Sequence, residues 1–148
     1  MHGDTKRGLG VAAALVAGAL LAAPAEPATG LEGTYRATLN APELLHAGET
    51  SAAAFDDAGV WTLVLTGGAW TMRQSSGAVG NSFDRGTFAR RGARLLLTLV
   101  SADGAPHHEY LGAVRVLKNG AVLRFAPVLP QTSDTLRVLA AESWRRVR

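Results

Sequence analysis

Apolar and polar positions alternate with a period of two along most of the chain beyond residue 32, which is typical of strands that bury one face. Glycine-containing joins and longer polar joins separate these runs. The pattern predicts eight strands: Gly33–Leu39, Gly59–Thr66, Ala69–Ser75, Phe83–Arg90, Ala93–Val100, His107–Lys118, Ala121–Val128 and Thr135–Val147. We therefore expect an all-β domain.

The joins between these strands alternate in length. Three are tight and contain glycine: Gly67-Gly68, Arg91-Gly92 and Asn119-Gly120. The joins between them are longer: residues 40–58, 75–82, 101–106 and 128–134. In an up-and-down meander, alternate joins lie at opposite ends of the sheet, so the tight turns define a floor and the long joins define a mouth.

Two-residue loops fix which residues oppose each other across a hairpin. The expected pairs are Leu65 with Trp70, Leu63 with Met72, Trp61 with Gln74, Phe88 with Leu95, Val116 with Leu123, Val114 with Phe125 and, outside, Arg115 with Arg124. All three hairpins then place their apolar residues on one face. One short helix cannot cover eight strands, so we predict closure into an antiparallel up-and-down barrel.

One short helix is expected in the first long loop, at Ala41–Ala47. Asn40 can cap it, Glu43 occupies the capping-box position and Gly48 can end it. The stretch Thr50–Asp57 is expected to add a further turn.

The first residues have the composition of an export signal. Lys6 and Arg7 precede an uninterrupted apolar run, Leu9–Ala22, and an A-x-A-like cleavage site follows at residues 23–25. The run is short for a membrane span, so no stable membrane insertion is expected. The predicted organisation is a signal peptide at 1–25, an N-terminal extension at 26–32 and a barrel domain at 33–148, in a secreted or extracytoplasmic protein.

Composition narrows the possible functions. The chain has no cysteine, which excludes disulfides and thiolate metal sites. Without residues 1–25, 13 basic and 11 acidic residues remain, so the positive charge is modest and no nucleic-acid partner is expected.

The layout of the chain resembles a lipocalin-like barrel of the calycin superfamily, of the bacterial secreted kind, over almost the whole mature chain. The resemblance is carried by a signal peptide, a first strand that opens Gly33-Thr34-Tyr35, a long first connection with a short helix, and seven further strands. It implies that the Tyr35 ring plugs the closed end, covered by Arg145 or Arg146 beside Trp144.

Side-chain parity and strand direction sort the inward residues by depth. Tyr35, Trp70, Phe88 and Trp144 are expected at the floor. The candidate ligand-binding residues are Trp61, Leu63, Met72, Leu97, Leu99, Tyr110, Val114 and Phe125, and the candidate rim residues are Leu44, Leu45, His46 and His108. Small inward residues (Ala37, Gly86, Gly112 and Ala140) favour some free volume, but a packed, tapered core has the same composition.

No constellation for catalysis or metal binding stands out. Residues 107–109 (His-His-Glu) read as a solvated loop edge, because neighbouring strand residues point to opposite faces. Asp56, Asp57 and Asp84 have no partner that the sequence can place, and no Gly-x-Ser-x-Gly motif is present. Arg115, Arg124 and Arg137 are expected on the barrel exterior. We expect neither an enzyme, a cofactor nor a metal.

Two functions remain. The first is a carrier or scavenger that holds a small hydrophobic molecule inside the barrel. The alternative is a protein-binding barrel, such as a protease inhibitor or an envelope interaction module, with a filled core. It would contact its partner through the mouth loops or residues 26–32.

Overall fold

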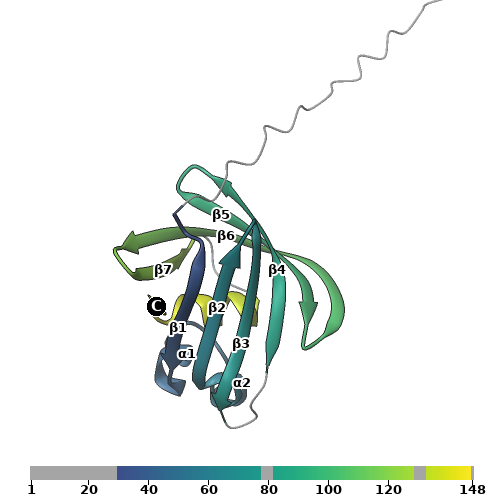
Figure 1. Cartoon of the computed structure of the whole chain (residues 1–148). Helices are drawn as coiled ribbons and strands as arrows, with labels where there is room; N and C mark the ends of the chain where they lie inside the picture. The colour runs from purple at the N-terminus through teal and green to yellow at the C-terminus, as the bar shows by residue number, and fades with distance from the viewer. Residues whose placement is uncertain (1–29, 78–81, 129–132, 148) are drawn as a thin grey trace, which may run out of the picture.

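The structure, a computed structural model, describes residues 30–77, 82–128 and 133–147. It shows a closed antiparallel barrel whose eight strands follow each other in chain order (Figure 1). The strands are β1 (Gly33–Leu39), β2 (Gly59–Thr66), β3 (Ala69–Gly77), β4 (Phe83–Arg91), β5 (Arg94–Ala102), β6 (Ala105–Asn119), β7 (Val122–Pro127) and β8 (Trp144–Arg146). The predicted fold class is confirmed. The predicted signal peptide lies outside the described residues.

The two ends of the barrel differ as the alternation of joins predicted. The helices α1 (Ala41–His46) and α2 (Ser51–Asp57) lie at the mouth, while the β4–β5 turn lies at the opposite end (Figure 1). Asn40 and Glu43 form the expected capping box, with both hydrogen bonds 3.0 Å long. Thr50 caps α2 by accepting a hydrogen bond from the Ala53 amide, so the expected turn is a helix of its own.

The β2–β3 hairpin has the predicted register, whereas the other two hairpins are shifted by two residues. Phe88 opposes Leu97 rather than Leu95, and Val116 opposes Phe125 rather than Leu123. The tight turns are therefore Gly92-Ala93 and Gly120-Ala121. A shift of two leaves every side chain on its predicted face.

The shifted register changes the arginine pairing on the outer surface. Arg115 opposes Ala126 on β7 and Arg94 on β5, not Arg124, which opposes Leu117. The expected Arg115–Arg124 pair is therefore wrong, although both side chains are exposed.

Strand β6 departs from simple alternation. The β5–β6 register shifts between Leu97 and Thr98 and again between Leu99 and Ser101. These bulges rotate the outer half of β6, so Leu111 is buried and Tyr110 is 61% exposed. The predicted inward orientation of Tyr110 is wrong for this reason.

The largest correction concerns the last predicted strand. Residues 135–147 form a helix, α3 (Asp134–Ala141), followed by the three-residue strand β8. The buried positions are Thr135, Leu136, Val138 and Leu139, a helical spacing that also contains the period-two pair Leu136 and Val138. The alternation of apolar and polar residues alone could not distinguish a strand from a helix in this segment. Its Leu, Arg and Ala residues favour a helix.

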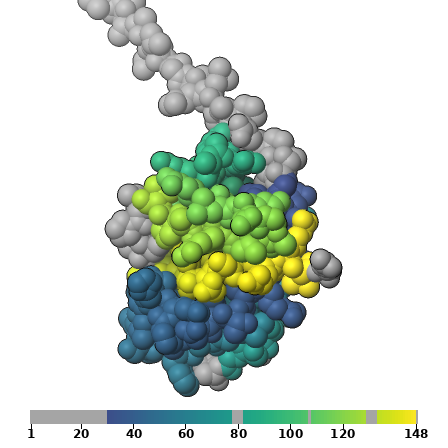
Figure 2. All heavy atoms as spheres, turned by 90° about the vertical axis from the view of Figure 1, so that its left-hand side faces the viewer, coloured from purple at the N-terminus to yellow at the C-terminus, as the bar shows by residue number. Residues whose placement is uncertain are grey.

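Helix α3 completes a barrel whose last strand is short. Strand β8 pairs with β1 only at Tyr35–Arg146 and Arg36–Arg145, and with β7 at two positions. Helix α3 packs against β6, β7 and α1 along the same seam. The space-filling view shows it filling the surface between β6–β7 and the α1–α2 region (Figure 2).

Candidate functional site

Seven of the eight predicted ligand-binding residues are buried in the barrel. They are Trp61, Leu63, Met72, Leu97, Leu99, Val114 and Phe125. They belong to one apolar cluster with the floor residues Tyr35, Trp70, Phe88 and Trp144 and with the inner face of α3. The interior is thus occupied by large side chains, and Tyr110 does not contribute to it.

The polar atoms of the buried aromatic residues are satisfied by backbone carbonyl groups. Trp61 Nε1 donates to the Asp57 carbonyl at 2.7 Å, Trp144 Nε1 to Leu139 at 2.9 Å and the Tyr35 hydroxyl to Leu31 at 2.8 Å. These hydrogen bonds fix the rings as structural elements of the core.

At the closed end, Tyr35 is fully buried and Arg146 lies on the neighbouring strand. Arg146 opposes Tyr35 across β1 and β8, and its guanidinium lies across Gly33 and donates to the Glu32 carbonyl at 2.8 Å. Burial raises the pKa of the Tyr35 hydroxyl, and Arg146 partly offsets this rise.

The predicted rim residues do not share one environment. Leu44, a residue of α1, is fully buried, whereas Leu45, His46 and His108 are exposed. The side chain of His107 lies outside the described residues. Among those that are described, no group of three or more His, Asp or Glu side chains is placed to hold a metal ion.

A hollow of about 270 Å³ lies at the mouth and was not predicted. It is bordered by Asp57, Trp61, Met72, Ser82, Asp84, Ala102, Asp103, Asp134, Thr135 and Val138. The border of the hollow therefore combines four aspartates with the apolar residues Trp61, Met72 and Val138. We call this feature the acidic mouth.

The four aspartates come from different elements, and local structure positions each of them. Asp84 lies near the start of β4 and accepts a hydrogen bond from the Thr135 hydroxyl at 2.9 Å. Asp103 lies in the β5–β6 turn with a left-handed φ of 47° and accepts from the Phe83 amide at 2.9 Å. Asp134 opens α3, where a carboxylate is favoured by the helix dipole.

Asp57 is positioned by the end of α2. Buried Gln74 donates to the carbonyl groups of Asp56 and Ala58, at 2.9 and 3.1 Å. Together with the Trp61 indole, it satisfies the free carbonyl groups that a helix leaves at its C-terminus. The last turn of α2, and with it the Asp57 carboxyl, is thereby fastened to β2 and β3.

Glu49 lies beside this group and is 6% exposed. Its carboxyl group lies beside that of Asp57. Burial, with the nearby carboxylates of Asp57 and Asp134, raises the pKa of Glu49 to about 8, while Arg137 opposes the rise. Burial and the neighbouring acids Asp134, Asp56 and Asp84 raise the pKa of Asp57 to about 6.

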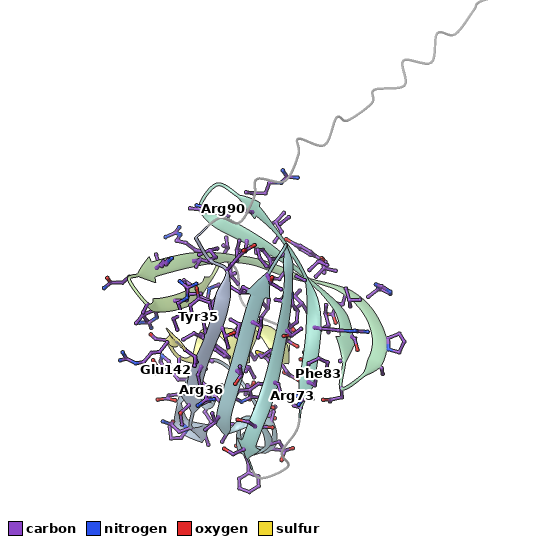
Figure 3. All side chains as sticks on the ribbon, in the orientation of Figure 1. Tyr35, Arg36, Arg73, Phe83, Arg90 and Glu142 are labelled. Atoms are coloured by element: carbon purple, nitrogen blue, oxygen red, sulfur yellow. The ribbon has the colours of Figure 1, made fainter. Side chains whose placement is uncertain are left out.

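Two arginines on the elements around the mouth make specific contacts. Arg137 pairs with Asp134 at 2.8 Å, one helical turn apart on α3. Arg73 lies over the Phe83 ring, with its guanidinium carbon 5.3 Å from the ring centroid (Figure 3).

A second hollow, of about 200 Å³, lies at the tight-turn end. Its border includes Arg90, Arg94 and Lys118 around the apolar side chains of Leu95 and Val116. Arg90 lies at the end of the barrel opposite α1 and α2 (Figure 3). A third hollow, of about 650 Å³, runs along the outer surface from Arg36 to Val147. Among the described residues, the hollow at the tight-turn end is thus bordered by basic side chains and the acidic mouth by acidic ones.

Sequence reasoning missed Glu49, Asp103 and Asp134 and treated Asp57 as a turn residue. A signal was nevertheless present, because all of these acids lie in or beside the long joins. Long joins meet at one end of a meander, so their charges gather there.

Comparisons with known proteins identify no relative of this chain. No family model, no curated protein and no solved structure matches this chain. Among the described residues, no helix has the length and apolar character needed to cross a membrane.

Proposed function

We propose that this protein is an exported, non-enzymatic binding protein with a lipocalin-like barrel, which recognises its partner at the mouth rather than inside the barrel. The observation that carries the proposal is the filled interior. Residues that would line a carrier cavity pack against one another, the floor and α3. The barrel then acts as a rigid scaffold, and its loops and helix ends provide the recognition surface.

The position and charge of the acidic mouth support the same proposal. Its carboxyl groups come from α2, β4, the β5–β6 turn and α3, so they depend on the assembled barrel. Concentrated charge at one end steers an oppositely charged partner toward that end.

The interior carrier is the competing proposal, and one observation favours it: seven of the predicted lining residues are buried. A ligand at that position would have to displace side chains of α3, such as Leu136 and Leu139. Returning each of them to water costs about 1.5–3 kcal/mol. The ligand would therefore need to replace most of those contacts.

Titration of the mature domain with a series of fatty alcohols and fatty acids distinguishes the two proposals. We expect no saturable quenching of tryptophan fluorescence and no rise in melting temperature. A one-to-one quench with a matching rise in melting temperature would overturn the filled-core proposal in favour of the carrier.

A further inference from the structure

We infer that the hollow bordered by Arg90, Arg94 and Lys118 binds a phosphate group, carried by a small soluble phosphomonoester or by a lipid headgroup. We call this feature the basic hollow. It lies at the opposite end of the barrel from α1 and α2 (Figure 3), so the inference goes beyond recognition at the mouth and does not depend on it. Three features carry it: inward-facing cations, the way they are held, and a like-charge pair across two strands.

The first feature is a pair of charged side chains at inward-facing positions. Arg90 takes the next position of the same parity after buried Phe88 on β4, and Lys118 takes the next after Val116 on β6. Alternate residues of a strand share one face, so both cations continue the inward face of the barrel. They border the same hollow from different strands. Its volume of about 200 Å³ is below the roughly 300–1,000 Å³ of pockets that take drug-sized molecules, so it suits a compact ligand.

The second feature is the way these cations are held. Arg90 Nε donates to the Gly92 carbonyl at 3.0 Å, and the Lys118 ammonium donates to the Gly30 carbonyl. No carboxylate of the described residues pairs with either cation. Glu32, in the same N-terminal segment as Gly30, accepts instead from the amide of residue 67 at 3.1 Å. The carbonyl groups thus position both cations without neutralising them, and the Nη groups of Arg90 and further ammonium hydrogens remain for an anion.

The third feature is a like-charge pair. Arg94, which borders the hollow, lies directly opposite Arg115 across β5 and β6, and both side chains are exposed. Like charges in opposite positions destabilise a sheet, and a bound anion offsets that repulsion. Guanidinium groups match phosphate oxygens in pairs, and a phosphate group carries more charge at pH 7 than a carboxylate. A phosphate group is therefore the anion that this arrangement favours.

Methyl phosphate is the probe, with methyl sulfate as its singly charged counterpart and trimethyl phosphate as its neutral one. Each is titrated into the mature protein at low ionic strength, and ¹H–¹⁵N spectra follow the Arg90 Nε–H signal and the Gly92 and Ala93 amides. We expect saturable shifts with methyl phosphate, weaker affinity for methyl sulfate and no saturable shift with trimethyl phosphate. The affinity for methyl phosphate should fall as salt is added. Absence of saturable methyl phosphate binding, or equal shifts with trimethyl phosphate, would overturn the inference.

Two variants locate the site. Arg90→Gln and Lys118→Gln each remove one charge but keep a side-chain N–H group that can donate to the Gly92 or the Gly30 carbonyl. Each should weaken methyl phosphate binding about tenfold, as expected for loss of one hydrogen bond from a charged group. Arg85→Gln, at an exposed position of β4 outside the hollow, is the matched control and should bind like the wild type. Unchanged affinity in both hollow variants, with melting curves that show folded protein, would reject the site.

Vesicles distinguish the two sources of the phosphate group. Cosedimentation compares phosphatidylcholine vesicles with and without phosphatidic acid, for the wild type and for Lys118→Gln. Sedimentation that requires phosphatidic acid and falls in the variant identifies a lipid headgroup as the source. Methyl phosphate binding without sedimentation identifies a soluble phosphomonoester. Uptake of a fatty alcohol into the interior would instead reject the proposed function and leave the basic hollow unaffected.

Discussion

Glu49 offers the sharpest physical prediction. Its carboxyl is buried beside that of Asp57, and its pKa is raised to about 8 from the ordinary value of 4.5. Glu49→Gln keeps the shape of the side chain and removes the charge. We expect this variant to lose most of the pH dependence of stability that the wild type shows between pH 5 and pH 9.

The magnitude follows from linkage. Between pH 4.5 and pH 8 the folded protein keeps a proton on Glu49 that the unfolded chain has released, so the free energy of unfolding falls as pH rises through this window. A difference of roughly three and a half pKa units corresponds to about 5 kcal/mol. This value is an upper limit, because Asp57 titrates together with Glu49.

Urea unfolding at pH 5, 7 and 9, followed by tryptophan fluorescence, measures this effect. The wild type should lose several kcal/mol across the series, and Glu49→Gln should be the more stable protein at pH 9. Glu43→Gln, at a capping-box position that accepts glutamine, serves as the control and should follow the wild type. Parallel pH profiles for the wild type and Glu49→Gln would refute the reasoning.

Three further predictions concern the barrel, and chemical denaturation checks each of them. A Cβ at Gly86 would lie 1.9 Å from the Thr98 carbonyl oxygen and 2.6 Å from the Trp70 ring, so Gly86→Ala should cost about 3 kcal/mol. Gly92→Ala, with open space and φ +59°, should cost only about 1 kcal/mol; equal losses would contradict the close approach. Leu136→Ala should cost about 2–5 kcal/mol if α3 seals the barrel, and a loss below 1 kcal/mol would show that it does not. Tyr110→Ala should change stability by less than about 0.5 kcal/mol, since its ring is exposed; a larger loss would place it back inside.

The barrel was predictable because several independent signals agreed. Alternation, tight glycine turns and strand direction all assigned Trp61, Leu63 and Met72 to the same face, and the structure buries all three. The turn positions near residues 91 and 119 were one residue off, which shifted the pairs by two. The predicted inward and outward faces were still correct, because side-chain orientation along a strand repeats every two residues.

The acidic mouth and helix α3 were not predictable in the same way. Leu136 and Val138 satisfy both a strand and a helix pattern, so alternation could not decide between them. Bulges in β6 reversed the orientation of Tyr110, and Gly112, at the first register shift, was the local signal that indicated one of them. Acids in the long joins indicated charge at the mouth, but their convergence with Glu49 required tertiary structure.

The three tryptophan side chains provide the most direct test of the account. Trp61 lies at the mouth, whereas Trp70 and Trp144 lie deeper, and each indole N–H donates to a backbone carbonyl. In a ¹H–¹⁵N spectrum, 1-octanol should shift none of the three indole signals. Saturable octanol-induced shifts of Trp70 and Trp144 would contradict a packed barrel that binds at its mouth.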